Sequence, residues 1–170
     1  MSSVHDVAAY IIQELGPVTP PKLQKLLYYC QAWRLVCDGV PLFEDAIEAR
    51  DFDPVVPEIY AIHQDDRNPL HGWPQGSSAN LQSDEKALIG AVLGQYGTMT
   101  ASQLSAMTHR EDPWMRAYVA EHNAPIDHES LREFYAEQLE EALDLAEVAK
   151  WDGTLTGAIT YEDLAAELGW

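Results

Sequence analysis

A run of apolar residues between Lys22 and Asp38 constrains the fold of this chain more than any other feature. One face of the run repeats at helical spacing: Leu23, Leu26, Leu27, Cys30, Trp33 and Cys37. Tyr28, Leu35 and Val36 make most of the remaining surface apolar too. A helix that is apolar on nearly every side lies in the middle of a bundle, covered by other elements. We therefore predict a central helix, which Thr19 caps before Pro20 and which ends at Asp38-Gly39.

Helical spacing of apolar residues predicts two long helices beside it, over 4–15 and 83–96, and an acidic one over 130–150. Shorter helices are expected to start at 57, 100, 112 and 160. Capping residues support several of these starts. They are Ser3 with Asp6, Thr100 with Gln103, Asp112 before Pro113, and Ser130 with Glu133.

The expected fold class is mainly α: a compact helical bundle with a minor short β element, plus a C-terminal extension. Residues 41–53 are expected to be irregular or weakly stranded, and 124–126 to form a short strand. We place a single helical domain at 1–150, because the length suits one domain. A strand and helix appendage, specific to the partner, is expected at 151–170.

Charge narrows the class of function. The net charge is −18 with only ten lysines and arginines, which disfavours a nucleic-acid binder, since phosphate contacts need basic side chains. Residues 127–170 carry 12 acidic and two basic side chains. That surface either steers a basic partner or is a solvated helix face. The longest apolar run is far too short to span a membrane, and no signal peptide opens the chain, so a cytoplasmic protein is expected.

Motifs of catalysis or metal binding are not found in the sequence. Cys30 and Cys37 are too far apart on one helix to bond to each other, and no C-x-x-C or H-x-x-x-H occurs. Nucleotide-binding glycine motifs and a G-x-S-x-G elbow are missing as well. Residues 109–112 (His, Arg, Glu, Asp) are either an acid/base site or, as we prefer, a helix start at which Asp112 caps and Trp114 packs. We expect no enzyme, cofactor or metal.

Four blocks, in order between Val4 and Tyr135, resemble the Panacea domain family of SocA-like antitoxins. They are VHDVAAYII, KLQKLLYYCQAW, PLFEDAIEARDFDPVVPEIY and DEKALIGAVLGQYGTMTASQLSAMTHREDPW. The second resembles the family signature K-L-Q-K-L-x-Y-Y-x-Q-A-W. The family usually reads A-W-x-x-G-P-V where this chain has Arg50 for the tryptophan and Asp53 for the glycine. We expect Asp53 to keep the turn in a left-handed conformation and Phe52 to replace the lost aromatic ring.

The resemblance implies an antitoxin that neutralises a cognate protein toxin, encoded by an adjacent gene, through direct binding. Three alternatives stay open: a proteolytic adaptor that delivers a toxin to a protease, an autoregulatory DNA-binding protein, and an enzyme at 109–112. A homo-oligomer is compatible with the sequence.

Aromatic and arginine side chains usually anchor such interfaces, and the basic start of the central helix is a second candidate edge. The candidate partner-binding residues are Lys22, Lys25, Tyr29, Trp33, Arg110, Trp114 and Trp151. Two of these, Trp33 and Trp114, are alternatively core residues. Lys22 and Lys25, together with Gln24, are alternatively a solvated helix end that caps the carbonyls of a neighbour.

Overall fold

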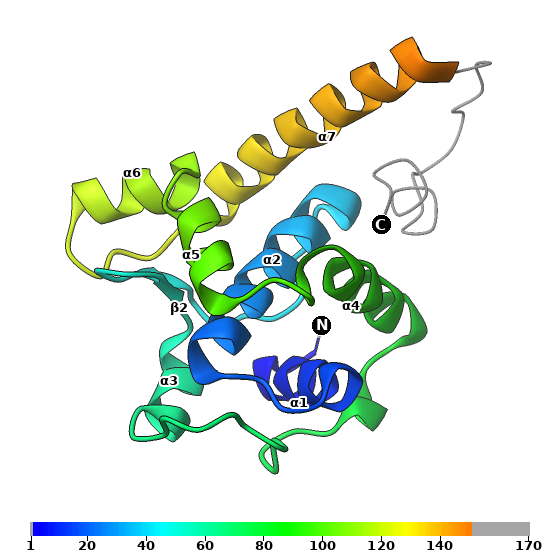
Figure 1. Ribbon diagram of the computed structural model, residues 1–170. Helices are drawn as coiled ribbons and strands as arrows, with labels where there is room; N and C mark the ends of the chain where they lie inside the picture. Colours follow the sequence, from blue (N-terminus) through cyan, green and yellow to red (C-terminus); the bar gives the residue numbers. More distant parts are fainter. Residues whose placement is uncertain (1, 151–170) are drawn as a thin grey trace.

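The computed structural model describes residues 2–150, with side chains to residue 140, and this part is mainly helical (Figure 1). Its helices are α1 (Val4–Leu15), α2 (Pro20–Asp38), α3 (Pro57–His63), α4 (Ser83–Tyr96), α5 (Ala101–Thr108), α6 (Asp112–Ala120), α7 (His128–Lys150) and the 3₁₀ turn η1 (Ser78–Asn80). Two strands of two residues each, β1 (Glu48–Ala49) and β2 (Pro54–Val55), form an antiparallel hairpin. The prediction of a mainly α bundle with a minor β element is confirmed.

Helix α2 is the centre of the bundle, as its apolar pattern predicts. It packs against α1, α3, α4, α5, α7 and β2, and 13 of its 19 residues are buried. Gly39 ends it in the left-handed conformation, with its N–H bonded to the carbonyl of Leu35. Cys30 and Cys37 are both free thiols on this helix.

Helices α2, α3, α4 and α5 start where the sequence predicts, whereas α1, α6 and α7 differ in their capping residues or first residue. Thr100 and Gln103 form the expected capping box. At α1 the side chain of Ser3 accepts from the N–H of His5, but Asp6 does not complete a capping box. Its Oδ1 instead accepts hydrogen bonds from the N–H of Ser77 (2.8 Å) and the side chain of Asn80 (3.0 Å). The capping-box prediction for Ser3 and Asp6 is therefore wrong, because a distant loop takes the carboxylate.

Two later starts are displaced. Glu111, not Asp112, is the N-cap of α6, and Asp112 pairs with Arg116 one turn on (2.6 Å). Helix α7 begins at His128, two residues before the predicted Ser130. The carboxylate of Asp127 accepts from both the N–H (2.8 Å) and the hydroxyl of Ser130 (2.6 Å), and this explains the earlier start.

The hairpin is extended by a third segment. Ile126 donates its N–H to the carbonyl of Ile47 (2.7 Å), and Ala49 donates to Ala124 (2.8 Å). The strand predicted at 124–126 is thus an isolated bridge beside β1. The expected left-handed Asp53 is wrong, because Asn123 is the one non-glycine residue with positive φ among those described. The turn is closed instead by a bond from the N–H of Arg50 to the carbonyl of Asp53 (3.1 Å).

Helix α7 starts against the body of the molecule, where it packs on α2 and α6, and its far end projects beyond the other helices (Figure 1). Among the described residues, none of the helices combines the length and apolar character needed to cross a membrane. The appendage predicted at 151–170 lies outside the described residues, and the domain assignment of 1–150 stays a prediction.

Candidate functional site

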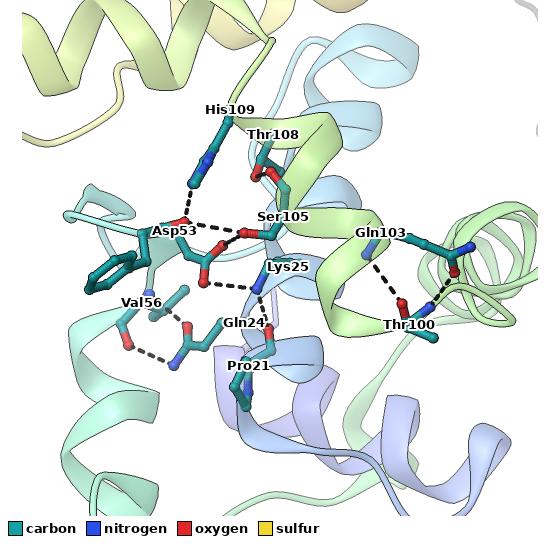
Figure 2. Close-up of polar contacts among 11 residues, drawn as sticks. Pro21, Gln24, Lys25, Asp53, Val56, Thr100, Gln103, Ser105, Thr108 and His109 are labelled. Carbon is teal, nitrogen blue, oxygen red and sulfur yellow. Dashed lines mark hydrogen bonds and ion pairs between the residues drawn. The ribbon is translucent and has the colours of Figure 1, made fainter.

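Two polar residues of the family signature, Gln24 and Lys25, point toward the hairpin and the segment that follows it and hold them in place (Figure 2). The ammonium of Lys25, only 1 % exposed, lies 2.9 Å from Oδ2 of Asp53 and donates to the carbonyl of Pro21 (3.2 Å). The second oxygen of Asp53 accepts from the hydroxyl of Ser105 on α5 (2.7 Å). Asp53 therefore ties the hairpin turn to both α2 and α5.

Two buried glutamines of α2 clamp the chain before and after the hairpin. The side-chain oxygen of Gln31 accepts the N–H groups of Leu42 (2.8 Å) and Phe43 (3.3 Å), and its nitrogen donates to the carbonyl of Phe43 (3.0 Å). Gln24 accepts from the N–H of Val56 (2.8 Å) and lies 2.9 Å from the ring of His63. Buried backbone groups need such partners, so these side chains have a structural role that explains their place in the signature.

The buried carboxylate of Glu111 accepts hydrogen bonds from the hydroxyls of three tyrosines. Tyr135 donates at 2.6 Å, Tyr29 at 3.0 Å and Tyr28 at 3.2 Å. Burial raises the pKa of Glu111 above its ordinary value, against the opposing effect of the three hydrogen bonds. Burial also raises the pKa of each of the three tyrosines, so their hydroxyls stay protonated as donors. Sequence analysis missed this cluster, since Glu111 lies 82 residues from Tyr29.

The cluster at 109–112 is not assembled into one acid/base site. His109 stacks on Trp114 (ring centroids 4.4 Å apart), and its Nε2 contacts the carbonyl oxygen of Phe52. The carboxylate of Glu111 binds tyrosine hydroxyls of other helices, whereas Asp112 pairs with Arg116 of its own helix. His109, Glu111 and Asp112 thus contact different partners.

Cysteine and metal chemistry fit this part of the chain poorly. Burial raises the pKa of the Cys37 thiol to about 12 and that of Cys30 further still, so neither thiol supplies a thiolate near neutral pH. No group of three histidine, cysteine or acidic side chains with metal-binding geometry occurs in the region that the structure describes.

The structure separates the predicted partner-binding residues into buried and exposed ones. Tyr29, Lys25, Trp33 and Trp114 are between 0 and 7 % exposed. Lys22 donates to the carbonyl of Gly97 at the end of α4, so it does cap a neighbour's carbonyl. Arg110 is exposed, and Trp151 lies outside the described residues. A partner-binding role for these seven residues stays a prediction.

Six exposed apolar side chains belong to the hairpin turn, α3 and α6, and we call this set the hairpin face. They are Phe52, Tyr60, Ile62, Met115, Tyr118 and Val119. Helix α6 packs on β1, and the hairpin lies between α6 and α3 (Figure 1). Phe52, at 76 % exposed, and Val119, at 78 %, are the most prominent.

A groove of about 390 Å³ opens beside the hairpin turn. Its wall includes Pro20, Pro21, Phe52, Tyr60, His63 and Asp66. The guanidinium of Arg50 lies 4.9 Å from the centre of the Tyr60 ring, which orders the turn against α3. In α6, Trp114 is the one large apolar side chain that is buried, whereas Met115, Tyr118 and Val119 are exposed.

Comparison with known proteins agrees with the expected resemblance. The model of the family described as "Antitoxin SocA-like, Panacea domain" matches residues 23–115, more than half of the chain. The chain belongs to this family. The match runs from α2 to the start of α6, so it covers the signature helix, the hairpin and Glu111.

A curated relative, Antitoxin SocA of Caulobacter vibrioides (strain NA1000 / CB15N), is 34 % identical over 113 residues. The alignment spans 58 % of each protein, so the chain covers little more than half of that relative's length. No solved structure matches this chain.

Proposed function

We propose that this chain is an antitoxin that neutralises a protein toxin by binding it directly. Membership in the SocA-like antitoxin family is the observation that carries the proposal. The contacts of the signature side chains support it. Lys25, Gln24 and Gln31 bond to groups inside the protein, so a partner would bind other residues, on the outer surface.

The hairpin face is the surface that we propose for the toxin. Large apolar side chains grouped at one edge are characteristic of interaction sites, and aromatic anchors such as Phe52 contribute most where they enter a pocket of the partner. The turn that carries Phe52 is fixed by the contacts of Asp53 with Lys25 and Ser105. A rigid turn loses little conformational freedom on binding, which favours affinity.

The buried candidates from the sequence would act indirectly in this arrangement. Trp114 stacks on both His109 and Tyr118, so it shapes the hairpin face from below. We propose residues 1–150 as the toxin-binding domain and 151–170 as a segment specific to the partner. We further propose that the toxin is encoded by the adjacent gene.

Binding to the product of the adjacent reading frame tests the proposal. The purified pair should form a complex, and Phe52→Asp should weaken it by about 30-fold or more, the size of a hot-spot loss. Val40→Asp is the matched control, because Val40 is 48 % exposed but lies after α2, outside the hairpin face. Isothermal titration calorimetry gives both dissociation constants. An equal loss in both variants would contradict the proposed face, and the lack of any wild-type complex would contradict the function.

A further inference from the structure

A second hollow, of about 440 Å³, lies between α2, the end of α4, the α5–α6 loop and α7. Its lining includes Trp33, Tyr96, Arg110, Glu111, Phe134 and Tyr135. Four of these, the two tyrosines with Trp33 and Glu111, are at most 8 % exposed and form the floor. The hollow therefore has an aromatic floor that contains one carboxylate.

The carboxylate in the floor lacks a cation. No lysine or arginine nitrogen lies within 4 Å of Glu111 among the side chains that the structure describes. The groups that bind it within the described part of the chain are tyrosine hydroxyls. A charge held away from water without a counter-ion costs free energy, and a cation that enters beside it recovers part of that cost.

Aromatic faces next to a carboxylate suit one kind of cation in particular. A guanidinium group is planar, weakly hydrated and stacks on aromatic rings while it donates to a carboxylate. Phe134 and Tyr135, both in the lining of the hollow, form an edge-to-face pair with their ring centroids 5.1 Å apart. The net charge of −18 also favours the approach of a cationic ligand.

We infer that this hollow binds the guanidinium group of an arginine side chain from the protein partner. The inference rests on the proposed function, because the arginine would belong to the toxin. The α5–α6 loop connects the hollow with the hairpin face, since His109 contacts Phe52 while Arg110 and Glu111 line the hollow. One partner can therefore use both. The exposed guanidinium of Arg110 lies in the lining and repels a second cation. Removal of this charge should therefore increase the affinity of the hollow for a guanidinium group.

The first test needs no toxin. Methylguanidinium chloride is titrated into the full chain, and the indole N–H resonance of Trp33 is followed by NMR, with sodium chloride at equal ionic strength as reference. We expect a saturable shift with methylguanidinium only. Gln138→Arg, an exposed position of α7 in the lining, should abolish the shift by placing a cation in the hollow. Gln75→Arg, at an exposed loop position, makes the same charge change elsewhere and should preserve it.

The second test uses the toxin complex. Gln138→Arg should weaken toxin binding by about tenfold or more, Gln75→Arg should leave it unchanged, and Arg110→Gln should tighten it. Equal shifts with methylguanidinium and sodium chloride would overturn the cation site. A wild-type complex that is insensitive to Gln138→Arg would overturn the arginine contact, while the proposed function would stand. Lack of any wild-type complex would contradict the proposed function itself, and the NMR result would still decide the site.

Discussion

Asp53 binds the ammonium of Lys25 from a turn position where the family usually carries glycine. The backbone there needs no left-handed residue, since Asn123 alone among the described non-glycine residues has positive φ. The side chain thus has a role that glycine lacks. It gives a buried lysine its counter-ion and accepts from Ser105 as well.

Removing this carboxylate should destabilise the fold. Asp53→Ala leaves the ammonium of Lys25 buried without an ionic partner, a loss of about 3 kcal/mol in the free energy of unfolding. Asp51→Ala, two residues earlier, removes only an exposed contact with His122 and should cost at most about 1 kcal/mol. Urea denaturation measures both. Similar costs for the two variants would contradict the buried-pair account.

Glu111 should make stability depend on pH. Burial raises its pKa above the ordinary 4.5, so the folded chain holds this proton more strongly than the unfolded chain. Its contribution is full below that ordinary pKa and is lost as pH rises through the raised value. The neighbouring tyrosines stay neutral there, because burial raises the pKa of each.

The variant Glu111→Gln cannot titrate and isolates this effect. The free energy of unfolding of the wild type minus that of Glu111→Gln should decrease as pH rises from about 4 to about 8. Denaturation of both proteins in matched buffers gives the difference at each pH. A difference that stays constant, or grows with pH, would show that the carboxylate is not held in a raised-pKa environment.

At the scale of elements, two glutamines of α2 accept hydrogen bonds from the segments before and after the hairpin. Gln31→Met would leave the N–H groups of Leu42 and Phe43 without their acceptor, and Gln24→Met would do the same to Val56. Each unsatisfied buried group costs about 1–3 kcal/mol. We therefore expect faster hydrogen exchange at residues 42–43 in the first variant and at Val56 in the second.

The two glutamine variants serve as each other's control in hydrogen exchange measured by NMR. Each should release its own segment while the other segment keeps its protection, because the contacts are separate. Uniform loss of protection in both variants would mean that the side chains stabilise the whole bundle and not the two ends of the hairpin.

Local patterns predicted the elements well and their partners poorly. The apolar run of α2, Gly39 at its end and the capping box at Thr100 all depend on neighbours in sequence. The clusters around Asp53 and Glu111 join residues 24 to 83 positions apart, and no periodicity encodes such pairs. Asp6 was misread for the same reason, since its carboxylate bonds to the distant Ser77 and Asn80. Asp112 has a local partner instead, Arg116 one turn on in the same helix.

The residues of the candidate site were predicted less well from the sequence than the elements were. Reasoning from residue type named Tyr29, Trp33 and Trp114 as candidates, with core packing as the alternative for the two tryptophans, and the bundle buries all three. It treated Phe52 only as a substitute aromatic, although Phe52 is among the most exposed apolar residues described. Exposure of an apolar side chain depends on how elements pack, so the sequence alone could not predict the hairpin face.

At the scale of the whole molecule, the net charge of −18 should govern association with a basic toxin. Long-range attraction speeds encounter and is screened by salt, whereas short-range contacts control dissociation. Raising sodium chloride from about 50 to 500 mM should therefore slow association more than it speeds dissociation. Stopped-flow mixing measures both rates, and an association rate independent of salt would rule out electrostatic steering.

Growth of cells that express the adjacent reading frame tests the central claim most directly, in a strain that lacks its main ATP-dependent proteases. Direct neutralisation predicts that the wild-type chain and Val40→Asp restore growth, that Phe52→Asp does not, and that the toxin accumulates in all three strains. Restored growth only where the proteases are present, with toxin levels falling, would contradict direct neutralisation and indicate a proteolytic adaptor.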